Sequence, residues 1–229
     1  MRLPTLLTEN PSFRRLWLAL LVISTGDRFG SIAMNLYVLK LTGSGGALAG
    51  MLAVQSLPSL FVAPLAGVWI DRLSRRRVML LGNFVLVLLY GLLPFAEELW
   101  QIYLLALLTK VAATFLLPAQ RALIPDLVEP WQVVEANGII GAGQQTILLI
   151  AASLAGLVVG TAGAGAAFAL CALSYLAANG LLWGIRRELP RTTTADRSLG
   201  QFLEELADGF RFILGHRGLR IVLVASFST

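Results

Sequence analysis

Long apolar stretches separated by short polar segments make up most of this 229-residue sequence. An α-helix needs about 20 residues to cross the hydrocarbon of a bilayer. Six stretches of about that length are present, at roughly 16–41, 47–70, 78–96, 100–118, 136–162 and 165–185. The pattern therefore predicts an all-α membrane protein whose residues 1–187 form a bundle of six transmembrane helices.

A different pattern follows the sixth stretch. Residues 188–198 are polar, and from Leu199 to Leu214 apolar residues recur at helical spacing with charged residues between them. This spacing is typical of an amphipathic helix at a membrane surface. We therefore expect residues 188–218 to be a cytoplasmic linker with an amphipathic helix. Residues 219–229 read as the start of a seventh span, which we expect to continue in a longer chain.

The composition supports a membrane protein and excludes several other classes. Apolar residues are 57% of the sequence, charged ones 14%, and the mean hydropathy is +0.77. A soluble protein of this composition would expose large apolar patches. The net charge of +5 does not indicate nucleic-acid binding, because the basic residues flank apolar stretches instead of covering one soluble surface.

Enzyme and cofactor motifs are also absent from the sequence. Cys171 and His216 are the only cysteine and the only histidine, which excludes an intrachain disulfide and a cysteine- or histidine-rich metal site. No phosphate-binding Walker loop or dinucleotide fingerprint occurs. We expect neither an enzyme nor a bound metal or cofactor.

Positive charge alternates between the segments that connect the stretches. Arginines precede the first stretch and follow the second, fourth and sixth, whereas the other connections carry Lys40, Glu97, Glu98 or no charge. Short loops rich in arginine and lysine face the cytoplasm. The sequence therefore predicts a multi-pass protein of the plasma (inner) membrane with a cytoplasmic N-terminus.

Three charged residues lie deep within the predicted spans. Asp27 and Arg28 are near the middle of the first stretch, and Lys110 is near the middle of the fourth. Charges at this depth cost at least a few kcal/mol and almost always face a protein interior or a wet cavity. Three interpretations remain open: Asp27 exchanges a proton or other ion beside Arg28 or Lys110, the charges bind an ionic substrate, or Asp27 and Lys110 form a permanent structural pair.

Two neutral polar residues lie on the same side of the first stretch. Ser31 and Asn35 follow Arg28 at i+3 and i+7, so all three share one helix face. They are candidates to line a cavity, although hydrogen bonding between helices explains them equally well. Five glycines in the fifth stretch are interpreted as positions of close helix packing: Gly138, Gly141, Gly143, Gly156 and Gly160.

The connection between the second and third stretches carries a charged motif. It reads Gly67-Val-Trp-Ile-Asp71-Arg72-Leu-Ser74-Arg75-Arg76-Arg77. This motif resembles the signature of the major facilitator superfamily, Gly-x-Leu-Ala-Asp-Arg-x-Gly-Arg-Arg/Lys. Gly67, Asp71, Arg72, Arg75 and Arg76 match, and Ser74 replaces the second glycine.

Other segments narrow the resemblance to one branch of that superfamily. The residues Phe115-Leu-Leu-Pro-Ala-Gln-Arg-Ala-Leu-Ile-Pro125 and Phe13-Arg-Arg-Leu-Trp17 are similar to those of siderophore and macrolide exporters. The resemblance implies that this sequence is the N-terminal half of a twelve-helix fold, and that a C-terminal half of six helices is missing from it. It also implies that Gly67, Asp71, Arg72, Arg75 and Arg76 form a conformational latch, although lipid anchoring explains the arginines as well.

The resemblance implies a secondary transporter in the lipid bilayer that exports a small organic molecule by alternating access, driven by a proton or another ion. The alternative is a membrane sensor or scaffold, or a naturally truncated half that does not transport. A membrane-embedded transferase ranks last, because the sequence has no acid-rich metal motif.

Overall fold

The computed structural model describes residues 5–62 and 74–185. Every regular element in these ranges is a helix, which confirms the predicted all-α class for this part of the chain. The chain divides into two units, 1–190 and 191–229. The predicted linker helix and the start of a further span both fall within 186–229 and lie outside the described residues.

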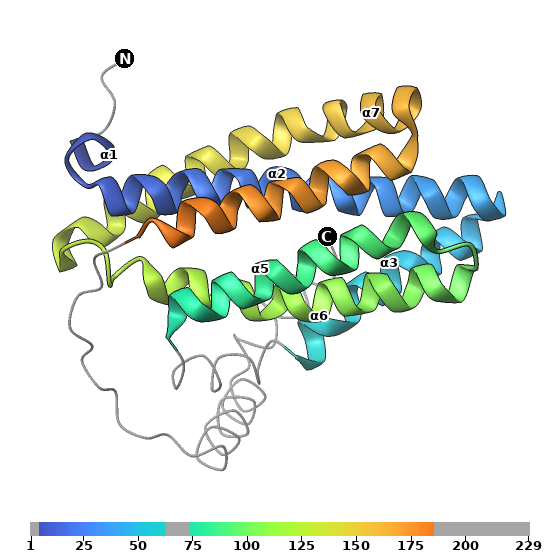
Figure 1. The fold of residues 1–229 in the computed structure, drawn as a ribbon, viewed down its shortest axis with the longest axis horizontal. Helices are drawn as coiled ribbons and strands as arrows, with labels where there is room; N and C mark the ends of the chain where they lie inside the picture. The colour runs from blue at the N-terminus through green and yellow to red at the C-terminus, as the bar shows by residue number, and fades with distance from the viewer. Residues whose placement is uncertain (1–4, 63–73, 186–229) are drawn as a thin grey trace, which may run out of the picture. The chain divides into compact units, whose positions relative to one another are not determined.

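The described helices follow the apolar stretches closely (Figure 1). They are α1 (Thr5–Glu9), α2 (Pro11–Thr42), α3 (Gly45–Phe61), α5 (Arg75–Leu92), α6 (Leu99–Leu123) and α7 (Val133–Trp183). Among the described residues, four segments are long and apolar enough to cross a membrane: α2, α5 with the turn after it, α6, and α7 with the turn before it. The count of six spans remains a prediction.

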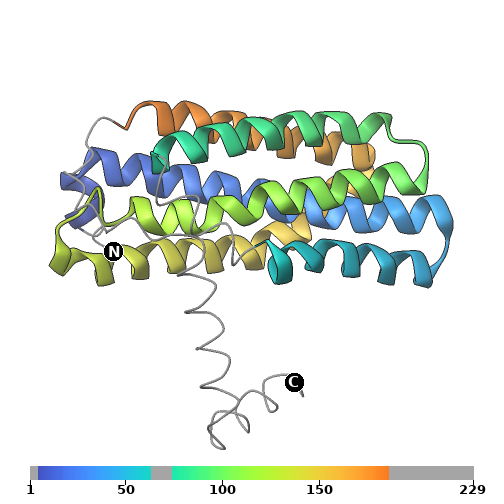
Figure 2. The same ribbon diagram turned by 90° about the horizontal axis from the view of Figure 1, so that it is seen from below.

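The fifth and sixth predicted stretches both lie in α7, which reverses direction at Gly163. This residue has φ 83° and ψ 169°, a backbone region that is essentially restricted to glycine. The two arms of α7 run in opposite directions, and α2 lies between them (Figures 1 and 2). The reversal coincides with the predicted break between residues 162 and 165.

Short polar residues mark where the helices begin. The side chain of Asn10 accepts a hydrogen bond from the backbone N–H of Phe13, and Ser44 and Ser74 cap α3 and α5 in the same way. These caps satisfy N–H groups that have no partner inside the helix. Ser74 therefore begins α5 at the position where the superfamily motif has a glycine.

Apolar side chains both fill the bundle and cover its outside. Phe13, Leu16 and Leu20 of α2 are fully buried against the other helices. α5 buries one face in the bundle and exposes the other. The exposed face is formed by Leu81, Phe84, Val85, Leu88 and Leu92. This face fits contact with lipid, because a bilayer offers apolar side chains a partner that water does not.

Gly30 of α2 leaves room for the side chain of Tyr90, which reaches it from α5. A Cβ added there would lie 2.6 Å from the Tyr90 hydroxyl oxygen, and both residues are buried. We expect Gly30→Ala to destabilise the protein by about 1–3 kcal/mol, the usual cost of overpacking. Thermal unfolding in detergent would measure this as a lower Tm.

Gly91→Ala is the matched control for that substitution. It lies in α5, and nothing comes within 4 Å of an added Cβ. Its Tm should stay unchanged or rise, since alanine favours a helix by about 1 kcal/mol over glycine. Equal effects of the two substitutions would contradict the packing argument.

In the part of the chain that it describes, the structure shows no close helix packing at most of the glycines of the fifth stretch. Within the described residues, a Cβ at Gly138, Gly141, Gly156 or Gly160 meets no atom within 4 Å. Gly143 alone of the five lies close to side chains, those of Trp17 and Leu21. The glycines that pack tightly against another helix include Gly26 and Gly30 of α2, against Ser174 and Tyr90.

Candidate functional site

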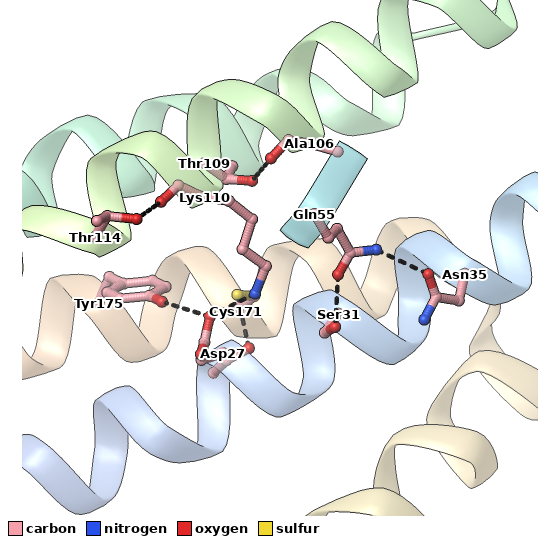
Figure 3. Close-up of polar contacts among 11 residues, drawn as sticks. Asp27, Ser31, Asn35, Gln55, Ala106, Thr109, Lys110, Thr114, Cys171 and Tyr175 are labelled. Carbon is pink, nitrogen blue, oxygen red and sulfur yellow. Dashed lines mark hydrogen bonds and ion pairs between the residues drawn. The ribbon is translucent and has the colours of Figure 1, made fainter. Parts of the chain in front are cut away.

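The deep charges Asp27 and Lys110 meet between α2 and α6 (Figure 3). The Nζ atom of Lys110 lies 3.6 Å from Oδ1 of Asp27. Charge-assisted hydrogen bonds are usually about 2.7–2.9 Å long, so this is a loose ion pair. The Asp27 side chain is 41% exposed and that of Lys110 is 19% exposed. The carboxylate is thus the more accessible partner.

Tyr175 of α7 is a second neighbour of Asp27. Its hydroxyl donates a hydrogen bond of 3.4 Å to the same Oδ1 atom. The Tyr175 ring stacks on Tyr90 of α5, with centroids 5.8 Å apart and 16° between the planes. One turn earlier in α7, the Cys171 thiol donates to the backbone oxygen of Gly26. Side chains from α5, α6 and α7 therefore meet α2 at this level.

A neutral polar group lies farther along α2. The Ser31 hydroxyl donates to Oε1 of Gln55 at 2.9 Å, and Nε2 of Gln55 donates to Oδ1 of Asn35 at 2.8 Å (Figure 3). All three side chains are half-buried. Because Ser31 and Asn35 follow Asp27 at i+4 and i+8, the carboxylate and the amides lie along one side of α2.

Arg28 does not join this group. It is exposed, and it has no hydrogen bond or ion pair with the described part of the chain. Adjacent residues on a helix point about 100° apart, so Arg28 turns away where Asp27 turns inward. Of the five candidate residues, Asp27 and Lys110 are in direct contact, and Ser31 and Asn35 are joined through Gln55 farther along the same side of α2.

The end of the bundle where α2 and α5 begin holds a cluster of arginines. Arg75 forms an ion pair with Asp126, and its guanidinium also donates to the backbone oxygen of Ala122 at 2.9 Å. Arg76 donates to the backbone oxygens of Leu182 and Trp183, at 3.0 and 2.6 Å. Arg75 thereby connects α5 to the end of α6, and Arg76 connects it to the end of α7.

The rest of the predicted latch is not described. Gly67, Asp71 and Arg72 fall within 63–73, outside the described residues. The sequence analysis did not identify Asp126. An acidic residue just after a span can pair with an arginine-rich loop at the same membrane side, and this position could have indicated its role. Tyr90, Tyr175 and Gln55 were also missed. Gln55 could have been noticed as a lone amide within an apolar stretch.

The described residues offer no metal site. No three side chains of the His, Cys, Asp or Glu type gather closely enough to hold an ion within 5–62 and 74–185. What the arrangement can do chemically is exchange the partner of one carboxylate, because Asp27 has a loose ion pair, a long hydrogen bond and an accessible face.

Comparison with known proteins gives one family. The sequence model of the Major Facilitator Superfamily matches residues 16–229. The Multidrug efflux pump Tap of Mycobacterium tuberculosis (strain ATCC 25618 / H37Rv) is 26% identical, over 93% of this chain and 53% of that protein. Macrolide efflux protein A of Streptococcus pyogenes is 22% identical, over 93% of this chain and 53% of that protein.

Two further similarities are partial or structural. Multidrug resistance protein 2 of Bacillus subtilis (strain 168) is 26% identical over 51% of this chain and 29% of that protein. The crystal structure of tetrameric PepTSo2 has a TM-score of 0.64 and 19% identity, and the match covers 94% of this chain and 51% of that one. That likeness concerns the fold alone. This chain spans about half the length of the efflux pump Tap and of macrolide efflux protein A, 53% in each case. Its match to Multidrug resistance protein 2 covers 29% of that protein.

Proposed function

The chain belongs to the Major Facilitator Superfamily, and from this premise we propose that it is half of a secondary active transporter that exports a small organic molecule. The match confirms the family resemblance, and it fits a multi-pass membrane protein that is not an enzyme. We further propose that the protein lies in the plasma (inner) membrane with its N-terminus in the cytoplasm. A second half would complete the carrier, and the two halves would rock about a site near the middle of the membrane.

The observation that carries this proposal is the contact between Asp27 and Lys110. Both residues lie near the middle of long apolar helices, where a charge needs a partner or water. A buried pair that served only to hold two helices together would be expected to be short and fully hydrogen-bonded. This pair is 3.6 Å long, and its carboxylate is 41% exposed.

The loose pair suggests how export would be coupled to an ion gradient. In one state Lys110 neutralises Asp27, and in another a proton or a substrate cation takes the place of Lys110 beside the carboxylate. The single negative charge of Asp27 can be neutralised by only one of these partners at a time, so binding of one favours release of another. Such an exchange moves the equilibrium between states by the difference in affinity for them.

We propose that Arg75 and Arg76 act in the latch together with Asp126. Their contacts join the beginning of α5 to the ends of α6 and α7. If these contacts exist in one state only, they bias the carrier towards that state. Gly67, Asp71 and Arg72 would complete the latch, as the superfamily motif implies.

Efflux from vesicles tests the proposal. The protein is expressed from its complete reading frame and reconstituted into liposomes loaded with erythromycin, a macrolide, or with ethidium, an organic cation. An imposed proton gradient should drive release of at least one probe, and an ionophore that collapses the gradient should stop it. The same experiment with an imposed Na⁺ gradient distinguishes the coupling ion. Release that is equal with and without every gradient would contradict secondary active transport.

A further inference from the structure

Two polar atoms on one side of α2 have no partner among the described residues. Both contacts of Asp27 are made through Oδ1, which leaves Oδ2 available. Asn35 accepts a hydrogen bond at its Oδ1 atom from Gln55, which leaves the two N–H bonds of Nδ2 available. A half-buried carboxylate oxygen and a half-buried amide donor are thus both open to a ligand.

The hydrogen bonds of Gln55 determine which end of the Asn35 amide is available. Gln55 accepts from Ser31 and donates to Asn35 (Figure 3). Since the amide oxygen of Asn35 is occupied, its nitrogen is the end that remains for a ligand. Asn35 therefore selects a hydrogen-bond acceptor, and Gln55 is a positioning residue.

The helix sets the distance between the two open groups. Residues 27 and 35 are eight positions apart in one continuous helix, α2. At about 1.5 Å per residue this separation is about 12 Å along the helix axis. Eight residues are also close to two full turns, so both groups lie on nearly the same side of α2.

The charge at the first group favours a cation. Asp27 is the more exposed member of its pair, and Lys110 occupies Oδ1 only. A protonated amine can first approach Oδ2, the oxygen that Lys110 does not contact, and then take the place of Lys110 beside the carboxylate. An anionic ligand would instead meet the carboxylate before it reached the less exposed ammonium group.

We propose that this face of α2 is a two-point binding site for molecules that carry a protonated amine and, about 12 Å away, a hydrogen-bond acceptor such as a hydroxyl or carbonyl oxygen. Asp27 binds the amine and Asn35 binds the acceptor. The proposal rests on the proposed function, because it takes the accessible Asp27 carboxylate as the substrate contact.

Binding of four simple amines tests the site without requiring transport. The protein from the complete reading frame is purified in detergent, and its affinity is measured by isothermal titration for 8-aminooctan-1-ol, n-octylamine, 4-aminobutan-1-ol and n-butylamine. The long amino alcohol reaches both groups, octylamine lacks the acceptor, and the short amino alcohol cannot span the distance. A hydroxyl should improve binding of the long amine more than that of the short one.

The preference for the hydroxyl should disappear when Asn35 is changed. One hydrogen bond contributes about 0.5–1.5 kcal/mol, so we expect Asn35→Leu to lower the affinity ratio of the long amino alcohol to octylamine about 2- to 10-fold. Gln55→Met should lower the same ratio, because it releases the Asn35 amide. It also provides the test if Asn35→Leu does not fold.

The control is Asn137→Leu, the same chemical change at an exposed amide whose one hydrogen bond within the described residues goes to Val133 of its own helix. This variant should keep the wild-type ratio. The proposal is overturned if wild type shows no extra preference for the long amino alcohol, or if Asn35→Leu and Gln55→Met both keep that preference. If the amines bind with the expected affinity ratios but the protein shows no gradient-driven efflux, the proposed transport function is contradicted and the proposed binding site is supported.

Discussion

Asp27→Asn is expected to reduce gradient-driven efflux to the level of protein-free vesicles while the amount of protein in the membrane stays unchanged. Asparagine has almost the same shape as aspartate, and its amide oxygen can still accept the hydrogen bond from Tyr175. It cannot carry a charge, take up a proton or pair with Lys110. Expression would be measured by immunoblot and efflux by release of erythromycin or ethidium.

Glu135→Gln is the matched control, because it removes one carboxylate at an exposed position in the first turn of α7. Its efflux should equal that of wild type. Undiminished transport by Asp27→Asn would remove Asp27 from the mechanism. Loss of transport in both variants would show only that the carrier tolerates no loss of negative charge.

Charge reversal at Arg75 is expected to have the second largest effect. Arg75→Asp places a carboxylate beside Asp126, whose side chain is only 14% exposed. Exposed pairs contribute less than about 1 kcal/mol and buried ones several, so we expect the balance between states to change by about 1–3 kcal/mol, or about 5- to 150-fold. The efflux rate should fall by at least the lower of these factors.

The exchanged pair provides the test of that contact. Arg75→Asp combined with Asp126→Arg restores opposite charges in reversed positions, and a large part of the lost efflux should return. A double variant no better than the single one would indicate that Arg75 acts through another partner, such as the backbone of Ala122. Arg77→Asp is the control, since the Arg77 side chain has no ion pair within the described residues.

Hydropathy predicted where apolar helices lie but not where they begin. The first stretch was placed at 16–41, whereas α2 runs from Pro11 to Thr42. Hydropathy marks the part of a helix that lies in hydrocarbon, and the helix itself continues to its caps. The caps Asn10, Ser44 and Ser74 are readable in the sequence once a helix is expected after them.

Depth along a helix could be calculated from the sequence, but partners on other helices could not. The positions of Asp27 and Lys110 were sufficient to make them candidates for one site, and the structure places them in contact. Tyr175 and Gln55 reach the same face of α2 only because of how α7 and α3 pack. Helical periodicity gives the direction of a side chain on its own helix and not the rotation of its neighbours.

The contacts of the glycines were also not predictable from their own helix. The regularly spaced glycines of the fifth stretch suggested close packing, and four of the five have no such neighbour in the described chain. Gly26 and Gly30, which do allow close contact with another helix, are four residues apart, a spacing typical of helix packing in membranes that the sequence analysis did not use. In contrast, Gly163 lies in the predicted break between residues 162 and 165, and its positive φ is the kind of conformation for which glycine is required.

Both proposed roles of Asp27 require that water reaches the inner face of α2 at its level, and thiol labelling measures this access most directly. In a Cys171→Ser background, Ser31→Cys and Leu88→Cys would be treated with a charged, membrane-impermeant maleimide in native membranes. We predict rapid labelling at position 31 from at least one side and none at position 88, which is exposed but lies on the apolar outer face of α5. No labelling at position 31 from either side, under conditions that label an engineered cysteine in a loop, would contradict the account.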